Sequence, residues 1–307
     1  MGCPLCGSLR RRDLARVRDE EYGTSDKRYL YVECRDCRLV YLPHPPLSQL
    51  KKIYPPNYYS ARPAEALGLL QRVKGALELR FFRRLLSRVP GKRLRVLDVG
   101  GGTGWMATAM RRADARVVES AVVDLDPGMR TAAQAQGHRF YASRIEGFKS
   151  PLRFDLIALF NLIEHVADPG RVLRQLRKSL APQGLLVVKT PNTDTIDRRL
   201  FESTYWGGYH APRHWVLFNR ENFTRLAADC GLEVAGFSYT QGAPQWTPSL
   251  MALFSRLRGA RPPLPSDRPM FEKPLAKLLL GLSAGFDFLR LPFFKTAQMF
   301  IILRRAA

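Results

Sequence analysis

From residue 95 onward, short apolar runs alternate with segments whose apolar residues recur at the three-to-four-residue spacing of a helix. The runs are rich in Val, Leu and Ile, and several end at glycine, aspartate or proline, as buried strands do. Strands that alternate with helices predict a parallel sheet with helices on both faces, which is an α/β fold. The expected strands are 95–99, 121–124, 139–142, 154–160, 185–190, 232–239 and 296–304, and the expected helices are 105–112, 127–136, 169–180 and 220–229.

Two stretches of different character precede this region. Residues 1–46 hold four of the five cysteines and predict a small module, whereas residues 47–94 have the character of a helical connector. The α/β region, 95–307, carries an insertion at 241–295 that is rich in Pro, Leu and Phe. Its most apolar stretch, 278–286, is much shorter than the roughly 20 residues of a membrane-spanning helix. An interfacial helix and a cap over the active site therefore both stay open.

A glycine-rich turn follows the first expected strand. Gly100, Gly102 and Gly104 let the backbone turn sharply and approach a ligand with no Cβ atom in the way, and the next helix directs its first amides there. Asp98 precedes the turn, and Asp124 ends the next strand, twenty residues after Gly104. A carboxylate in that position can accept both hydroxyls of a ribose. The alternative is a turn of structural glycines with an aspartate that caps a helix.

This pattern resembles the class I S-adenosylmethionine-dependent methyltransferases, over residues 95–239. The resemblance implies a seven-stranded, Rossmann-like, doubly wound sheet whose last strand is antiparallel, with S-adenosylmethionine as the cofactor. It implies that the glycine turn holds the methionine and ribose portions, that the acid after strand two binds the ribose, and that the loop after strand four lines the methyl donor. The residues implied to contact the cofactor are Asp98, Gly100, Gly102, Gly104, Asp124 and Asn161. A helix N-cap is the alternative role for Asn161.

The cysteines of the N-terminal module form two Cys-x-x-Cys pairs that are separated by 27 residues. Paired knuckles of this kind supply four thiolates to a tetrahedral zinc ion, and four protein ligands leave no open position, so a structural zinc ribbon is expected. Disulfides and unligated thiols are the alternatives, and a reducing compartment disfavours the first of these. The expected ligands are Cys3, Cys6, Cys34 and Cys37.

Methyl transfer to an oxygen or nitrogen requires a base that removes a proton. The candidates follow the fourth and fifth expected strands: His214 is favoured, and His165, His210 and Tyr209 are the others. A structural histidine is the alternative for His214. The Glu164–His165 pair also resembles a pair in quinone-type O-methyltransferases, where a divalent ion can take part, but Asn161 stands where that motif carries an acid.

The formal net charge of +22 favours acidic partners such as nucleic acid or an anionic membrane, although arginines scattered along the chain explain much of it. No apolar run follows Met1, so no signal peptide is expected, and a cytoplasmic location is the default. A ribbon ahead of a methyltransferase domain resembles bacterial proteins of sugar and polysaccharide assembly. The leading expectation is therefore methylation of an O or N atom, less readily a C atom, of a small-molecule, sugar or glycan acceptor.

Two other functions stay open. One is a nucleic-acid-binding protein or RNA methyltransferase that uses the ribbon and the basic surface. The other is a membrane-surface methyltransferase that acts on a lipid-linked acceptor through residues 278–294 and contacts the inner face of the membrane peripherally. The sequence does not identify the acceptor or the oligomeric state.

Overall fold

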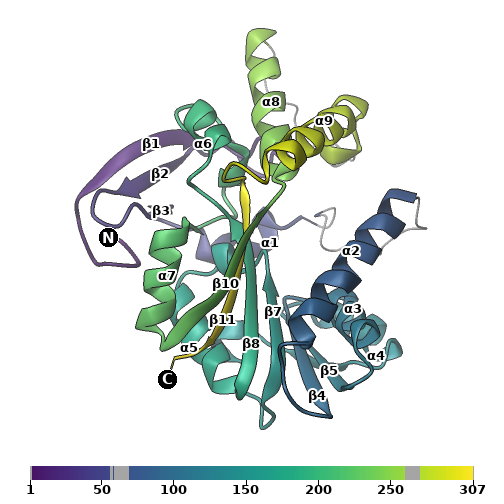
Figure 1. Cartoon of the computed structure of the whole chain (residues 1–307). Coiled ribbons are helices and arrows are strands. Elements are labelled where there is room, and N and C mark those ends of the chain that lie inside the picture. The colour runs from purple at the N-terminus through teal and green to yellow at the C-terminus, as the bar shows by residue number, and fades with distance from the viewer. Residues whose placement is uncertain (1, 56–57, 59–68, 260–269, 307) are drawn as a thin grey trace.

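The computed structural model describes residues 2–55, 58, 69–259 and 270–306. Its main sheet has seven strands in the order β10-β11-β8-β7-β4-β5-β6 (Figure 1). The strands are β4 (Leu94–Val99), β5 (Val117–Asp124), β6 (Arg139–Ala142), β7 (Phe154–Phe160), β8 (Leu180–Pro191), β10 (Leu232–Thr240) and β11 (Gln298–Arg305).

The strand directions confirm the predicted Rossmann-like sheet. β4 runs parallel to β5 and β7, β5 to β6, and β7 to β8, whereas β11 is antiparallel to both of its neighbours, β8 and β10. Parallel neighbours need crossover connections, and the helices predicted between the strands supply them. The carboxyl ends of the parallel strands therefore meet at one end of the sheet, where ligands bind in such folds.

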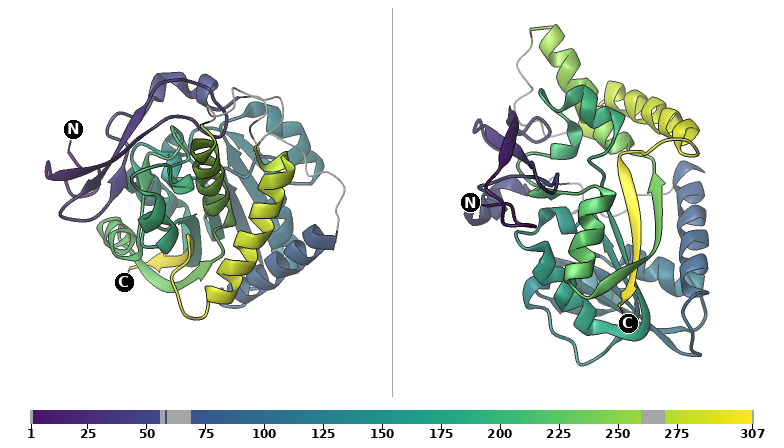
Figure 2. Two further views of the ribbon diagram at one scale, coloured as in Figure 1. Left: turned by 90° about the horizontal axis from the view of Figure 1, so that it is seen from above. Right: turned by 60° about the vertical axis from the view of Figure 1, so that its left-hand side comes forward.

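Helices cover both faces of this sheet (Figures 1 and 2). Val96 of β4 packs in one apolar cluster with α2 and α3, and its neighbour Leu97 packs in another with α5 and α7, because successive side chains of a strand point to opposite faces. Burial on both faces explains the continuous apolar runs in the sequence. These helices are α2 (Leu69–Leu86), α3 (Trp105–Ala113), α4 (Arg130–Ala135), α5 (Pro169–Ser179) and α7 (Arg220–Asp229).

A second, antiparallel sheet carries the N-terminal cysteines. Its order is β1-β2-β3-β9, with β1 (Arg11–Val17), β2 (Tyr29–Cys34) and β3 (Val40–Tyr41) from the N-terminal region. The fourth strand, β9 (Val216–Leu217), comes from the segment after β8. The N-terminal module is therefore joined by hydrogen bonds to a segment near residue 210, far along the chain. The proposed boundary at residue 46 stays a prediction.

The segments around β8 differ from the sequence-based expectation. β8 begins at Leu180 because this residue already pairs with Phe154, so the strand includes residues that were expected to form a turn. The segment between β8 and α7, where the sequence predicted neither a helix nor a strand, contains α6 (Ile196–Phe201), which begins where the Thr195 side chain accepts a hydrogen bond from the amide of Arg198. It also contains a single 3₁₀ turn, η6 (Gly207–Tyr209).

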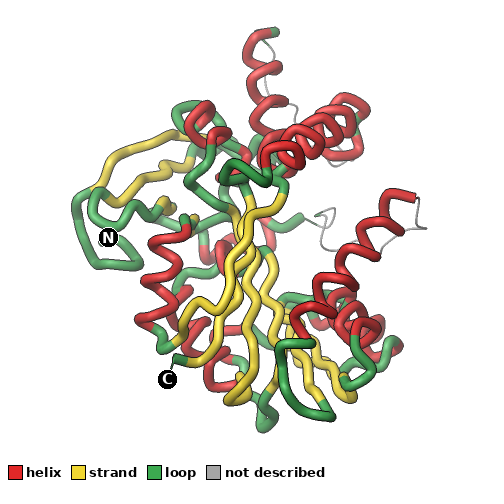
Figure 3. The backbone as a smooth tube through the Cα atoms, viewed as in Figure 1, coloured by secondary structure: helices red, strands yellow, loops and turns green. Residues whose placement is uncertain are grey.

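The insertion 241–295 forms two helices that project from the carboxyl end of the sheet, as the right-hand view of Figure 2 and the tube of Figure 3 show. They are α8 (Ala243–Leu257) and α9 (Pro274–Arg290), which pack against each other. Short elements complete the described chain: η1 (Leu47–Gln49), α1 (Leu50–Ile53), η3 (Pro127–Met129), η4 (Ile145–Gly147), η5 (Ile163–His165) and η7 (Met270–Glu272).

Candidate functional site

The glycine turn between β4 and α3 has the conformation that its sequence predicts. Gly100, Gly102 and Gly104 have φ values of 70°, 52° and 88°, in the left-handed region that favours glycine. A Cβ atom added to Gly102 would meet no atom within 4 Å, so the space beside this residue is open. The turn thus presents bare backbone to an open space at the carboxyl end of the sheet.

Asp98 supports the turn from below. Its side chain is 3% exposed and accepts a hydrogen bond from the amide of Ala107 in α3, at 3.2 Å. Burial raises the pKa of Asp98 to about 7, since removal from water penalises the charged carboxylate. Gly101, which the sequence analysis missed, makes room for it, because a Cβ atom there would lie 2.4 Å from Cγ of Asp98.

Asp124 ends β5 beside the same turn. Its Oδ2 atom accepts a hydrogen bond from the amide of Gly102 at 2.9 Å, and Oδ1 accepts one from the amide of Asp126. The neighbouring Asp126, not Asp124, caps the following 3₁₀ turn by accepting from the amide of Gly128. The structure thus separates the two aspartates: one holds the glycine turn and the other caps a helix.

His138 forms a wall of the glycine turn that the sequence analysis did not identify. A Cβ atom on Gly104 would lie 2.4 Å from Cδ2 of His138. Its Nδ1 atom lies 2.7 Å from Oγ of Ser120, and its Nε2 atom lies 2.8 Å from Oγ1 of Thr108. Burial lowers the pKa of His138. The two hydroxyls hold the imidazole ring in place. Any side chain at position 104 would therefore displace the ring of His138.

The loop after β7 contacts the turn from the other side. Leu162 packs on Gly100, where a Cβ atom would lie 3.1 Å from its Cδ2 atom. Asn161 is exposed, has a φ of 50° and donates its backbone amide to the carbonyl of Lys189. The 3₁₀ turn that follows begins at Ile163 and has Leu162 at its N-cap position, without a side-chain cap, so the structure does not support the N-cap role for Asn161.

Glu164, His165 and His214 come together next to this loop. Each places one potential ligand atom so that the three atoms lie within 4.8 Å of one another, and the two imidazole rings are 4.7 Å apart. Glu164 is fully buried, and its Oε2 atom accepts a hydrogen bond from Thr190 while Oε1 has no partner among the described residues. A carboxylate and two imidazoles suit either a divalent cation or a shared proton.

The two histidines form hydrogen bonds through their Nδ1 atoms. Nδ1 of His214 lies 2.7 Å from the carbonyl of Gly208, and because a carbonyl oxygen only accepts, this Nδ1 atom carries the proton and Nε2 keeps a lone pair. Nδ1 of His165 lies 3.1 Å from the carbonyl of Arg213 and 2.9 Å from the hydroxyl of Tyr54, which can donate or accept. Burial and the neighbouring rings lower the pKa of His165 to about 3 and that of His214 well below its usual value. Burial raises the pKa of Glu164 to about 8.

Tyr209 lies close in sequence but has a different environment. Its ring is fully buried and stacks on Tyr31 at 4.4 Å, and its hydroxyl donates to the carbonyl of Glu202 at 2.7 Å. The structure therefore brings His165 and His214 together but engages the Tyr209 hydroxyl elsewhere. The third histidine of the cluster is His210, whose ring is 4.9 Å from that of His214 and which the sequence analysis did not favour.

The N-terminal module supplies the wall behind these histidines. Arg213 forms a fully buried ion pair with Asp19, with Nη2–Oδ2 and Nη1–Oδ1 distances of 2.7 and 3.2 Å. Glu21 lies 2.9 Å from Nδ1 of His210. Tyr54, in the connector that follows the module, places its hydroxyl 2.9 Å from Nδ1 of His165. Sequence alone gave no signal for these partners, since almost two hundred residues separate Asp19 from Arg213.

The four expected zinc ligands also converge. Sγ of Cys3 lies 3.5 Å from that of Cys37, the Cys6–Cys34 distance is the same, and all four sulfurs lie within 4.8 Å of one another. All four are free thiols, which excludes the disulfide alternative in this structure. The two knuckles have matching backbones: Gly7 and Arg38 have φ values of 73° and 58° and donate to the carbonyls of Cys3 and Cys34. This arrangement fits a tetrahedral metal ion.

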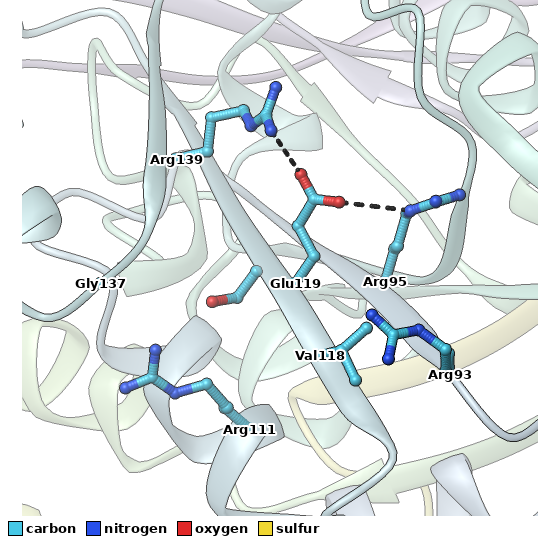
Figure 4. Close-up of a pocket in the computed structure, with 8 residues that line it drawn as sticks. Arg93, Arg95, Arg111, Val118, Glu119, Gly137 and Arg139 are labelled. Carbon is cyan, nitrogen blue, oxygen red and sulfur yellow. Dashed lines mark hydrogen bonds and ion pairs between the residues drawn. The ribbon is translucent and has the colours of Figure 1, made fainter.

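A surface pocket of about 480 Å³ lies at the opposite end of β5 from Asp124 (Figure 4). Glu119 lies at its centre and pairs with Arg95 at 3.2 Å and with Arg139 at 2.9 Å. Arg93 and Arg111 also line it. The glycine turn and the histidines are not among its lining residues, so this pocket is separate from the candidate site.

A family model described as a methyltransferase domain matches residues 71–235, more than half of the chain. A ubiquinone biosynthesis O-methyltransferase of Bradyrhizobium diazoefficiens is 32% identical over 175 residues, which are 50% of this chain and 65% of that protein. An uncharacterized methyltransferase of Mycolicibacterium gilvum is 30% identical over 173 residues, 53% of this chain and 64% of that protein. The chain spans less than two thirds of the length of these relatives.

Among solved structures, coclaurine N-methyltransferase bound to N-methylheliamine and SAH is similar, with a TM-score of 0.50 and 13% identity. The similarity covers 85% of this chain and 82% of that one. At this level of identity it concerns the fold alone.

Proposed function

The chain belongs to the S-adenosylmethionine-dependent methyltransferases, and from this premise we propose that it methylates a hydroxyl oxygen of a small-molecule acceptor. The main support for cofactor binding at this turn is the hydrogen bond from the Gly102 amide to Asp124. It holds a carboxylate beside the open space at Gly102, where that carboxylate would accept the hydroxyls of the cofactor ribose. Asp98 and Gly100–Gly104 would shape the backbone around the methionine portion, and Asn161 would line the methyl donor.

The bound cofactor supplies an electrophilic methyl group on a positively charged sulfur. The protein's task is to align the acceptor oxygen with that methyl group and to accept its proton. The cofactor sulfur would keep the electron pair of the bond that it loses, so the protein's own residues would have only the acceptor proton to take up. The Nε2 lone pair of His214 is the favoured proton acceptor near the loop after β7, and His165 beside it is the second candidate. The Tyr209 hydroxyl, which already donates to Glu202, has no role in this step.

An oxygen acceptor is proposed because several relatives are named ubiquinone biosynthesis O-methyltransferase. Sugar, glycan, nucleic-acid and lipid-linked acceptors remain outcomes of the acceptor experiment below.

We also propose that Cys3, Cys6, Cys34 and Cys37 hold a structural zinc ion as thiolates. Four protein ligands leave no position for substrate, so the ion would stabilise the β1–β2–β3–β9 sheet. That sheet also contains β9, which begins two residues after His214. Zinc binding would therefore also stabilise the position of His214.

The acceptor experiment uses labelled methyl donor with the purified chain. We expect label to enter hydroxylated small molecules, phenols and catechols first, and to be lost in Asp124→Ala. Transfer only to RNA or polysaccharide would overturn the small-molecule part of the proposal. Addition and removal of Mg²⁺ or Zn²⁺ in the assay would show whether Glu164, His165 and His214 hold a cation.

The proposed base is tested by His214→Gln with His44→Gln as the matched control, because His44 is exposed and lies outside the cluster. We expect kcat of His214→Gln to fall by about 100-fold or more, as the loss of a general base does, while cofactor affinity stays unchanged. An unchanged kcat in His214→Gln would remove His214 from the reaction, and the same measurement on His165→Gln would test the second candidate.

A further inference from the structure

Helix α9 exposes most of its large apolar side chains and buries mainly small and polar ones. Leu275, Leu278, Leu282, Phe286 and Leu289 recur at helical spacing and are 38–75% exposed. The residues of α9 that pack inward are Ala276, Leu279, Ser283 and Asp287. A surface helix normally has the opposite arrangement, with its apolar stripe on the core.

The orientation of α9 is fixed by a buried polar anchor. Asp287 is fully buried and accepts hydrogen bonds from the amide of Gly242 at 2.7 Å, from Nε1 of Trp246 at 3.2 Å and from Arg290 at 3.1 Å. Rotation of the helix to bury its leucines would leave this carboxylate without those partners, at a cost typical of buried polar groups. The outward apolar stripe is therefore a built feature.

The exposed stripe continues beyond the helix. Phe293 and Phe294, in the turn after α9, are 79% and 60% exposed, and Leu257 at the end of α8 is 74% exposed. Among the described residues, eleven of the nineteen exposed large hydrophobic side chains lie between Leu253 and Phe294. Such a concentration marks an interaction surface. We call these eleven side chains the α8–α9 apolar face: Leu253, Phe254, Leu257, Leu275, Leu278, Leu282, Phe286, Phe288, Leu289, Phe293 and Phe294.

The charges around this face favour an anionic membrane over a second copy of this chain as its binding partner. Arg256, Arg258 and Lys277 are exposed on these helices or next to them. Lys295 is exposed too, but it pairs with Asp194. The described acids of the same segments are Asp287, which is buried, and Glu272, which is exposed, so the exposed side chains carry a net positive charge. Exposed phenylalanines and leucines with a rim of Lys and Arg suit the headgroup boundary of an anionic bilayer. A second copy of this chain would instead place one cationic rim against another. We propose that the α8–α9 apolar face docks on an anionic phospholipid surface.

The helices lie on the bilayer in this arrangement and do not cross it. Within the described ranges, the structure contains no helix with the length and hydropathy that crossing would need. α9 has 17 residues and a buried aspartate on its inner side, which fits an interfacial helix.

The apolar face is connected to the candidate acceptor site. Ser249 of α8 accepts a hydrogen bond from the amide of Gly207 at 2.8 Å, and a Cβ atom on Gly207 would lie 2.2 Å from the carbonyl of Gln245. Gly207 begins the short segment that leads to His210 and His214. Docking would therefore hold this end of the sheet against the bilayer and favour an acceptor that partitions into lipid. This last step rests on the proposed function, whereas the docking itself does not.

The test is flotation of the full chain with vesicles of phosphatidylcholine alone or mixed with phosphatidylglycerol. We expect binding to the mixed vesicles and much less to the neutral ones. The triple variant Leu282→Glu, Leu289→Glu, Phe293→Glu removes apolar anchors at exposed positions, so it should fold with an unchanged melting temperature. Its affinity for the mixed vesicles should fall by about tenfold or more, because each anchor contributes apolar area to binding.

The matched control is Leu9→Glu, Leu47→Glu, Val118→Glu, which adds the same charge at exposed apolar positions elsewhere. Its affinity should change much less. Equal losses in both triple variants would mean that charge alone binds the vesicles, and this would overturn the proposed face. Failure of the intact chain to bind mixed vesicles would also overturn it, as would self-association that only the first variant abolishes. If the intact chain binds mixed vesicles but transfers no methyl group, the proposed function is contradicted and the proposed docking face is not.

Discussion

The carboxylate of Asp19 and the guanidinium of Arg213 form an ion pair with no exposure to solvent, 2.7 Å apart. Asp19 follows the first strand of the N-terminal module, and Arg213 lies between two histidines of the candidate acceptor site. The Arg213 side chain also donates to the carbonyl of Ile53 and lies 4.4 Å from the ring centre of Tyr22. The module that carries the cysteines is thus part of the wall of the proposed acceptor site.

This ion pair predicts a large effect of Asp19→Asn. The substitution leaves the Arg213 charge buried without its partner, which typically costs about 3–5 kcal/mol. Chemical denaturation followed by tryptophan fluorescence would measure the loss. Asp13→Asn is the control, since Asp13 is exposed on β1, and its free energy of unfolding should change by less than about 0.5 kcal/mol. Equal effects of the two substitutions would contradict a structural role for the pair.

The raised pKa of Asp98 predicts a specific pH dependence. Burial brings this pKa to about 7 in the folded chain, against about 3.9 in an unfolded one. The folded state therefore binds more protons between these values, and the contribution of Asp98 to stability falls as pH rises from about 4 to about 7. Asp98→Asn is neutral throughout this range and should show a flatter profile.

Urea denaturation of the cofactor-free chain tests this. Between about pH 5 and about pH 8, the wild type should lose on the order of 2 kcal/mol more stability than Asp98→Asn. Parallel profiles for the two proteins would show that Asp98 is ionised throughout, and the account of its burial would then be wrong.

The glycine turn predicts that two chemically identical substitutions differ. Gly102→Ala and Gly104→Ala both place a side chain at positive φ, which costs about 1–2 kcal/mol. Gly102 faces open space, whereas Gly104 faces His138, 2.4 Å from where its Cβ atom would lie. We therefore expect Gly104→Ala to lose more stability, and Gly102→Ala to lose cofactor affinity with the smaller loss of stability. Thermal melting would measure the loss of stability in both variants, and calorimetry would measure their cofactor affinity. A larger loss of stability in Gly102→Ala than in Gly104→Ala would contradict this prediction.

The cysteine cluster predicts sensitivity to chelators. A metal that binds only the folded chain stabilises it, so removal should lower the melting temperature by at least about 5 °C. Cys34→Ser should abolish this sensitivity, whereas Cys230→Ser, at a buried thiol outside the cluster, should retain it. Metal analysis of the purified protein should find about one zinc ion per chain. A chain without metal, or one indifferent to chelators, would contradict the zinc site.

Local patterns predicted much of this molecule. The strand pattern, the glycine spacing and the Cys-x-x-Cys pairs depend on neighbouring residues, so the sheet, the turn at Gly100–Gly104 and the set of four thiols could be anticipated. The strand β9 and the Asp19–Arg213 pair could not, because they join segments that lie far apart in the chain and have no repeating pattern. The sequence showed that the α9 region is rich in leucine, but it did not show which face of the helix is exposed. The packing around Asp287 decides that.

Calorimetric titration with S-adenosylmethionine tests the central claim most directly, comparing the wild type with Asp124→Ala and Asp126→Ala. The two aspartates are neighbours, but only Asp124 accepts the amide of Gly102, whereas Asp126 caps the next turn. The account predicts binding by the wild type, a loss of affinity of about tenfold or more in Asp124→Ala, and little change in Asp126→Ala. Absence of binding by the wild type, or equal affinities in all three proteins, would contradict it.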